Sequence, residues 1–202
     1  MDGPCTRPSE FSEITADEAS RIVIQAPAKH CALDPAPTWL IKHLLPLLAN
    51  TLANIRNSTF QEGLFPDILK QLLRKVVRPC LKNPGLNTND LSSYRPISNL
   101  CFVSKVVERA VVARLTAHTE LQRLFPCCQS AYIRKQHSTE TADVVHDEIV
   151  KSVGSGDVCA LLLLDLGAAF ATVDHHTPLQ VLASRFGLAD RALHWCESYL
   201  SL

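Results

Sequence analysis

The sequence has no apolar run long enough to cross a bilayer. Its longest uninterrupted apolar stretch covers residues 158–164, whereas a transmembrane helix needs about 20 apolar residues. The start of the chain also lacks the apolar core of a secretion signal, because Asp2, Arg7 and Glu10 lie there. We therefore predict an intracellular protein without a membrane anchor, and the sequence does not distinguish nucleus from cytoplasm.

Cysteine pairs with the spacing of a metal or redox motif are absent as well. None of the eight cysteines forms a C-x-x-C pair, so we interpret them as small buried apolar residues in a reducing compartment. Cys127 and Cys128 lie near His137, but structural zinc sites use cysteines about two to four residues apart. A second candidate cluster, Asp174 with the adjacent histidines at 175–176, is better interpreted as a surface turn. We discount zinc at the cysteines and a metal cluster at the histidines.

Low-complexity tracts and internal repeats are also missing, and the composition is ordinary. Hydrophobic residues make up 47% and charged residues 20% of the chain, which excludes a collagen, a disordered tail and a membrane protein. The 202 residues suffice for one domain of average size or two small ones.

The net charge of zero conceals an uneven distribution. Residues 1–67 have a balance of −3, residues 68–114 carry 9 basic against 2 acidic side chains, and residues 115–202 have a balance of −4. Such a basic block is either a surface for phosphates or nucleic acid or a solvated face, and charge alone does not decide between them. The basic block consists of Lys70, Arg74, Lys75, Arg78, Lys82, Arg95, Lys105, Arg109 and Arg114.

Hydrophobic periodicity predicts several helices. Thr15 and Glu18 have the spacing of a capping box, which predicts a helix to about residue 25. Leucines recur at helical spacing over residues 38–56, with a break expected at Pro46. Further helical patterns cover residues 104–124, 139–152 with Ser138 as cap, 177–186 and 188–200.

Two segments are predicted as strands. Residues 72–82 mix valine, leucine and basic residues without helical period, and loop residues follow at 83–93. Residues 158–166 form a continuous apolar run flanked by glycines, which is typical of a strand buried on both faces. Gly154 and Gly156 before that run indicate a helix exit rather than a phosphate loop.

Asp165 is the most informative single position, because it lies at the exit of the predicted buried strand. A charged carboxylate there costs free energy unless a cation or hydrogen-bond donors meet it. A divalent metal is one such partner. A cap of the following turn or a pair with a nearby base is the other, and spacing alone favours this structural role.

Three motifs resemble the reverse transcriptase of LINE-type (non-LTR) retrotransposons. They are YRPISNL at 94–100, QSAY at 129–132 continuing to HSTETA at 137–142, and LLDLGAAF at 163–170 with VDH at 173–175. LDP at 33–35 and GLFP at 63–66 match upstream. Their order and spacing make the resemblance specific from about residue 11 to residue 202.

The resemblance implies an α+β right-hand polymerase that copies RNA into DNA. Residues 1–66 would form a helical N-terminal extension, residues 67–153 a fingers-like region, and residues 154–202 the start of an incomplete palm. The implied ancestral partners are an RNA template, a DNA primer and a deoxynucleoside triphosphate, and the implied cofactor is Mg²⁺. The basic block would then lie in the fingers, where template and triphosphate run.

The resemblance also assigns roles to individual residues, and it reverses the preference stated above for Asp165. Asp165 matches the first metal-binding aspartate of the palm and is therefore the expected catalytic residue. Arg95 and Lys82 match positions that contact the triphosphate, and the main-chain amides of Leu166 and Gly167 would touch it as well. Phe170 matches the aromatic position that excludes a ribose 2′-hydroxyl.

Departures from the family pattern lead us to expect an inactive polypeptide. Ala171 replaces the acidic residue that usually follows the palm phenylalanine, and the paired aspartates of a later palm segment do not occur in the sequence. One carboxylate cannot hold two Mg²⁺ ions about 4 Å apart. We therefore expect a truncated reverse transcriptase that is inactive alone.

A different class of function stays open beside the enzyme. The alternative is a non-catalytic module that binds RNA through the fingers or self-associates through strand edges left open by the unfinished palm. Salt-dependent affinity would distinguish RNA binding from strand pairing. For the truncated reverse transcriptase itself, loss of most of the palm leads us to expect marginal stability or aggregation.

Overall fold

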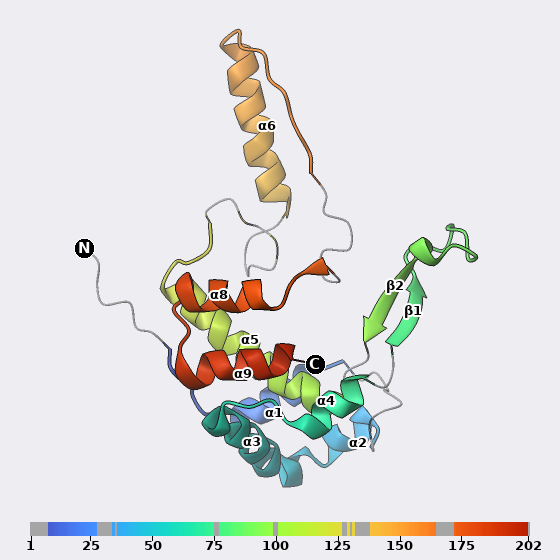
Figure 1. Ribbon diagram of the computed structural model, residues 1–202, viewed down its shortest axis with the longest axis vertical. Helices are drawn as coiled ribbons and strands as arrows, with labels where there is room; N and C mark the ends of the chain where they lie inside the picture. Colours follow the sequence, from blue (N-terminus) through green and yellow to red (C-terminus); the bar gives the residue numbers. More distant parts are fainter. Residues whose placement is uncertain are drawn as a thin grey trace. The chain divides into compact units, whose positions relative to one another are not determined.

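A computed structural model describes residues 8–27, 34, 36–74, 77–98, 101–126, 129, 131, 138–164 and 172–201. The chain forms two compact units, Met1–His118 with His175–Leu202, and Thr119–Asp174. The described residues are mainly helical with a two-stranded sheet, in agreement with the coarse α+β prediction (Figure 1). The elements are α1 (Ala16–Gln25), α2 (Thr38–His43), α3 (Leu45–Glu62), α4 (Asp67–Arg74), β1 (Val77–Leu81), the 3₁₀ turn η1 (Leu91–Ser93), β2 (Tyr94–Ser98), α5 (Phe102–Leu121), α6 (Ser138–Gly154), α8 (His176–Ser184) and α9 (Asp190–Leu200).

Helix α1 begins where the capping pattern predicts. The Thr15 hydroxyl accepts a hydrogen bond from the Glu18 N–H at 3.2 Å, which satisfies one of the donors left open at a helix start. The second half of the predicted capping box does not form, because the Glu18 carboxylate binds Arg114 instead. An ion pair with a distant guanidinium has replaced a local bond to the backbone.

The break at Pro46 is confirmed. Helix α2 ends at His43, Leu44 separates the two helices, and Pro46 lies in the first turn of α3, where its missing N–H leaves no helical bond unmade. Helix α3 ends at Gly63, whose φ is +65°, and a Cβ there would lie 3.0 Å from the Arg191 carbonyl oxygen. Both the conformation and the close approach of α9 therefore call for glycine.

The strand predicted over residues 72–82 is only half correct. Helix α4 extends to Arg74, and β1 then pairs antiparallel with β2. Cys80 lies opposite Arg95, and the Lys82 N–H beyond the strand donates to the Ser93 carbonyl at 2.8 Å. Residues 72–74 carry apolar and basic side chains that suit a helix as well as a strand, so composition alone could not separate the two.

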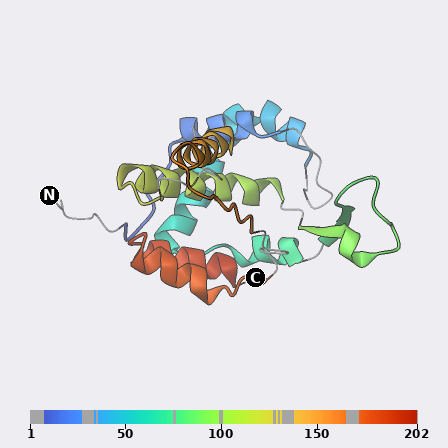
Figure 2. The same ribbon diagram turned by 90° about the horizontal axis from the view of Figure 1, so that it is seen from above.

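The core of the first unit joins the beginning and the end of the chain. Helix α5 buries the predicted stripe of Val106, Val107, Ala110 and Val111. Helix α9 packs on α3 and lies beside α8 (Figure 2), and the Phe65 N–H donates to the Ser198 hydroxyl at 3.1 Å. The aromatic part of this core consists of Phe11, Phe60, Phe65, Trp195 and Tyr199.

The prediction of a buried strand at residues 158–166 is wrong for the part that the structure describes. Residues 158–164 follow α6 without strand structure, and their large apolar side chains are exposed. The exposed fractions are 99% for Val158, 58% for Leu161, 78% for Leu162, 82% for Leu163 and 83% for Leu164. A strand exists only with a partner to pair with, and the described residues supply none for this run. The glycines before it do form the predicted helix exit, with Gly156 at φ +86°.

The cysteines only partly follow the expectation of buried thiols. Cys101 and Cys196 are buried, whereas Cys80 and Cys159 are exposed, and all four are free. Cys127, Cys128 and His137 lie outside the described residues. Over the described ranges, no helix combines the length and the apolar character that a membrane span requires.

Candidate functional site

The sequence-predicted site residues fall into two groups. Lys82 and Arg95 belong to the described β1–β2 hairpin, where both side chains are exposed. Asp165, Leu166, Gly167 and Phe170 lie outside the described residues. The structure therefore supplies geometry for the two cations only.

The hairpin ladder continues one residue past β1, because the Lys82 N–H donates to the Ser93 carbonyl, and this register indicates one face for Lys82 and Arg95. Residues directly opposite in an antiparallel pair share a face, and so do residues two apart along one strand. Arg95 is opposite Cys80, and Lys82 is two residues beyond Cys80. Within the described part of the chain, neither cation forms a hydrogen bond or an ion pair. These two exposed cations, with the free Cys80 thiol opposite Arg95 and the Asp90 carboxylate in electrostatic reach of Lys82, are available to bind a phosphate.

The connection between the two strands is held by its own hydrogen bonds. The Asp90 carboxylate accepts the Ser92 N–H at 2.9 Å and the Ser92 hydroxyl at 2.6 Å, and these bonds lower the pKa of Asp90. The Tyr94 hydroxyl donates to the Thr88 carbonyl at 2.9 Å. This bonding orders the turn that leads into β2. It thereby fixes the backbone from which the Arg95 side chain projects.

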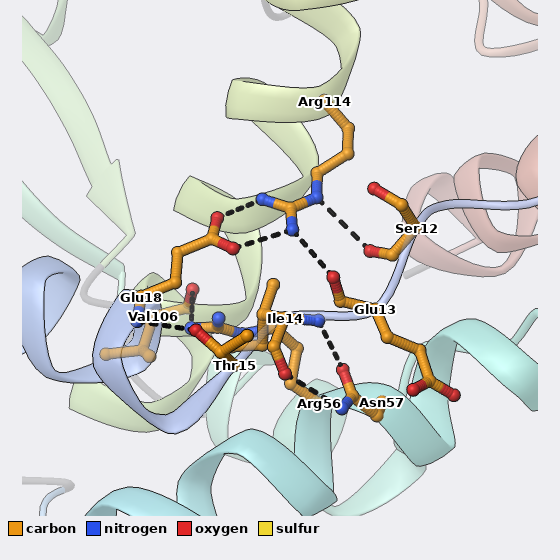
Figure 3. Close-up of polar contacts among 9 residues, drawn as sticks. All are labelled: Ser12, Glu13, Ile14, Thr15, Glu18, Arg56, Asn57, Val106 and Arg114. Atoms are coloured by element: carbon orange, nitrogen blue, oxygen red, sulfur yellow. Dashed lines mark hydrogen bonds and ion pairs between the residues drawn. The ribbon is translucent and has the colours of Figure 1, made fainter.

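Not all of the basic block is available to a ligand. The Arg114 guanidinium binds both carboxylate oxygens of Glu18 and donates to the carbonyls of Ser12 at 3.2 Å and Glu13 at 3.0 Å (Figure 3). It thereby fastens the segment before α1 to α5. Lys70 pairs with Asp67 at 3.3 Å, and Lys75 lies outside the described residues. Arg114 is thus a structural residue, contrary to the interpretation of the whole block as one anion surface.

Arg56 is a buried cation that the sequence analysis did not single out. Its side chain is fully buried, and its Nη2 donates to the Val106 carbonyl at 2.9 Å. Its Nε and Nη1 have no hydrogen-bond partner among the described residues, and burial lowers the pKa of Arg56 to about 10. The signal was available, because Arg56 continues the apolar stripe of α3 midway between Leu52 and Phe60.

The Glu18–Arg114 pair predicts a specific pH dependence of stability. The hydrogen bond from Arg114 holds the pKa of Glu18 below its ordinary value of 4.5. This contribution is therefore complete above about pH 4.5 and is lost as the pH falls through the lower folded-state value. We expect Glu18→Gln to reduce the free energy of unfolding by about 1–2 kcal/mol at pH 7 and to flatten its decline in acid, as measured by urea unfolding from pH 3 to pH 7.

Glu108 provides the matched control for that measurement. Burial raises its pKa, although the Tyr199 hydroxyl donates to its carboxylate. Ionising Glu108 therefore costs the folded state free energy as the pH rises above 4.5. Glu108→Gln should accordingly stabilise the protein at pH 7. If the free energy of unfolding depends on pH in the same way for the wild type and for Glu18→Gln, the role given to the Glu18–Arg114 ion pair is contradicted.

The described residues do not form a magnesium site. They contain no group of three or more His, Cys, Asp or Glu side chains placed to hold a metal ion. His175 precedes the first turn of α8 and His176 begins it. Burial raises the pKa of Cys196 to about 11, so this thiol is protonated at neutral pH and is a poor nucleophile.

Comparison with known proteins gives a family match and several relatives. Residues 81–202 match the family described as reverse transcriptase (RNA-dependent DNA polymerase). The chain is 26% identical over 180 residues to the RNA-directed DNA polymerase from mobile element jockey of Drosophila melanogaster, which covers 87% of this chain and 19% of that protein. It is 33% identical over 95 residues to the "Probable RNA-directed DNA polymerase from transposon X-element" of the same organism, which covers 47% and 10%.

A third Drosophila melanogaster relative, named "Probable RNA-directed DNA polymerase from transposon BS", is 30% identical over 125 residues, which cover 61% of this chain and 13% of that protein. The chain thus spans only about a tenth to a fifth of the length of these relatives. No solved structure matches it significantly.

Proposed function

Because this chain belongs to the reverse transcriptase (RNA-dependent DNA polymerase) family, we propose that it supplies the fingers and the beginning of the palm of an RNA-directed DNA polymerase. The family match covers more than half of the chain and begins at Leu81, inside the hairpin. We assign residues 1–66 to an N-terminal extension, residues 67–153 to the fingers and residues 154–202 to the palm. The LINE-type prediction made from the motifs is confirmed.

The observation that carries the proposal is that two exposed cations, Lys82 and Arg95, belong to the same hairpin. A guanidinium offers a planar fork of donors that suits phosphate oxygens, and an ammonium adds a point charge. Both side chains are exposed and lie within the residues that match the family. In the proposed function they bind the triphosphate of an incoming deoxynucleotide, while an RNA template and a DNA primer lie nearby.

Asp165 remains the proposed metal ligand and catalytic carboxylate. The family generally uses divalent metal ions, and Asp165 stands in the motif that carries the resemblance. Leu166 and Gly167 are proposed to contact the triphosphate through their amides, and Phe170 to select deoxyribose. The 202-residue sequence contains no adjacent aspartate pair, so we propose that this polypeptide alone binds its substrates without polymerising them.

One primer–template assay tests these statements. A labelled RNA template with a DNA primer and a deoxynucleoside triphosphate is expected to bind the 202-residue protein without primer extension in Mg²⁺ or Mn²⁺. Lys82→Gln with Arg95→Gln should weaken triphosphate binding about tenfold or more, because charge-assisted hydrogen bonds are lost. Lys151→Gln, an exposed lysine of α6, is the control. Extension abolished by Asp165→Ala would refute the proposed inactivity, and unchanged binding would refute the role of the hairpin.

A protein-interaction module is the second candidate, and the exposed run at residues 158–164 favours it. These seven residues carry no charge, no proline and no glycine, and their large apolar side chains are more than half exposed. Such a segment is suited to pair with a strand of another chain. We propose that isolated copies of this protein self-associate through it.

A further inference from the structure

A cavity of about 230 Å³ lies in the first unit, between the end of α1 and the first turns of α5. Ala26 and Pro27 close it on one side, and Asp34 and Phe102 meet at the start of α5. Lys105 and Arg109 are one helical turn apart and so project from the same face of α5. The cavity is therefore lined by two cations and one carboxylate, the remaining lining residue being the apolar Val106.

The acceptors around the cavity already have donors. The Asp34 carboxylate accepts the Phe102 N–H at 2.6 Å. The carbonyls at the end of α1 are taken by the Lys42 ammonium, which donates to Ile24 at 2.9 Å and to Ala26 at 2.6 Å. Neither Asp34 nor the exit of α1 therefore depends on Lys105 or Arg109 for hydrogen bonds.

The donors of the two lining cations are in surplus. Lys105 forms no hydrogen bond or ion pair with any residue that the structure describes, and Arg109 makes one long bond of 3.5 Å from Nη1 to the Ile22 carbonyl. A guanidinium has five N–H groups and an ammonium three, so most of these donors are unused. The start of the 20-residue helix α5 adds positive potential on the same side.

We propose that this cavity binds a phosphate group between Lys105 and Arg109. A cavity of this volume accommodates a phosphate or pyrophosphate, and the excess of donors over acceptors excludes a metal cation. The group is either the backbone phosphate of a single-stranded nucleic acid or a free phosphate. The inference rests on the first unit alone and does not require the proposed polymerase function.

Binding of inorganic phosphate and pyrophosphate to the full 202-residue chain, followed by calorimetry or by amide chemical shifts, tests the proposal. Lys105→Gln is expected to weaken binding about tenfold while the protein stays folded, because this ammonium forms no hydrogen bond or ion pair with a described residue and acts on Glu108 only through its charge. Arg109→Gln should weaken it as well, and Lys151→Gln should have no effect. Absence of saturable binding, or equal affinity in all variants, overturns the proposal.

A second arm identifies the source of the phosphate. A single-stranded RNA oligonucleotide is titrated over a salt series, where each phosphate contact contributes about 0.7 to the slope of log affinity against log salt. A slope reduced by about 0.7 in Lys105→Gln with Arg109→Gln supports a nucleic-acid backbone, and an unchanged slope with weakened pyrophosphate binding supports a free phosphate. Failure of the hairpin proposal appears as unchanged triphosphate binding in Lys82→Gln with Arg95→Gln, whereas failure of this proposal appears as unchanged pyrophosphate binding in Lys105→Gln with Arg109→Gln, so the two failures are distinguished.

Discussion

Trp195→Ala is expected to destabilise the protein by about 3–5 kcal/mol, in the range observed when a buried aromatic residue is truncated. Trp195 is 3% exposed and stacks on Tyr199 with ring centroids 5.5 Å apart. Phe11 and Phe65 meet it edge-on at 6.0 Å and 5.6 Å. One indole therefore joins the segment before α1, the loop after α3 and helix α9, and its loss leaves a cavity among all three. Urea unfolding followed by circular dichroism measures the change.

Trp195→Phe is the matched control. The Trp195 Nε1 is buried and has no hydrogen-bond partner among the described residues, so phenylalanine removes volume without removing a hydrogen bond. Trp195→Phe should reduce the free energy of unfolding by less than half as much as Trp195→Ala. Removing the unpaired buried N–H is favourable, and it offsets part of the packing free energy that is lost. If the alanine variant unfolds at the wild-type urea concentration, the aromatic cluster does not hold the two ends of the chain together.

Leu162→Lys with Leu164→Lys is expected to convert a self-associating protein into a monomer. Both side chains are about four-fifths exposed, and charges on an open strand oppose pairing with another chain. Sedimentation at micromolar concentration should show oligomers for the wild type that persist in high salt, because apolar pairing is not screened by ions. The double variant should sediment as a monomer at every salt concentration.

Leu91→Lys controls for the general effect of an added charge. Leu91 is 88% exposed, but it lies in the η1 turn between the polar residues Asp90 and Ser92 and so belongs to no apolar run. This variant should self-associate as the wild type does. A wild-type protein that is monomeric at all concentrations would contradict the interaction proposed for residues 158–164.

The helices show how much of the fold was predictable from local patterns. The α5 stripe, the Thr15 cap and the break at Pro46 all depend on residues within a few positions of one another, and all three were predicted correctly. The errors come from partners far along the chain. Glu18 was expected to bond its own backbone and binds Arg114 instead, 96 residues away. Arg56 was not singled out, although its place on the α3 stripe indicated burial.

The candidate site divides in the same way. Lys82 and Arg95 were found by resemblance, but the pairing register of β1 with β2 decides that they share a face. The cavity beside Lys105 and Arg109 was not predicted at all, because Asp34 reaches the start of α5 only in the folded chain, where its carboxylate accepts the Phe102 N–H. Asp165 remains a prediction from its motif.

The amino-acid sequence by itself determined the family and the positions of most helices, because motifs and hydrophobic periodicity depend only on residues close together in the sequence. Only the tertiary structure decided which charges are available to a ligand. Arg114 forms an ion pair with Glu18, and Arg56 is buried. Lys105 and Arg109, in contrast, have unused hydrogen-bond donors beside a cavity. The physical reason is that the free energy of a charge depends on burial and on neighbours supplied by distant segments, and neither is encoded in local spacing.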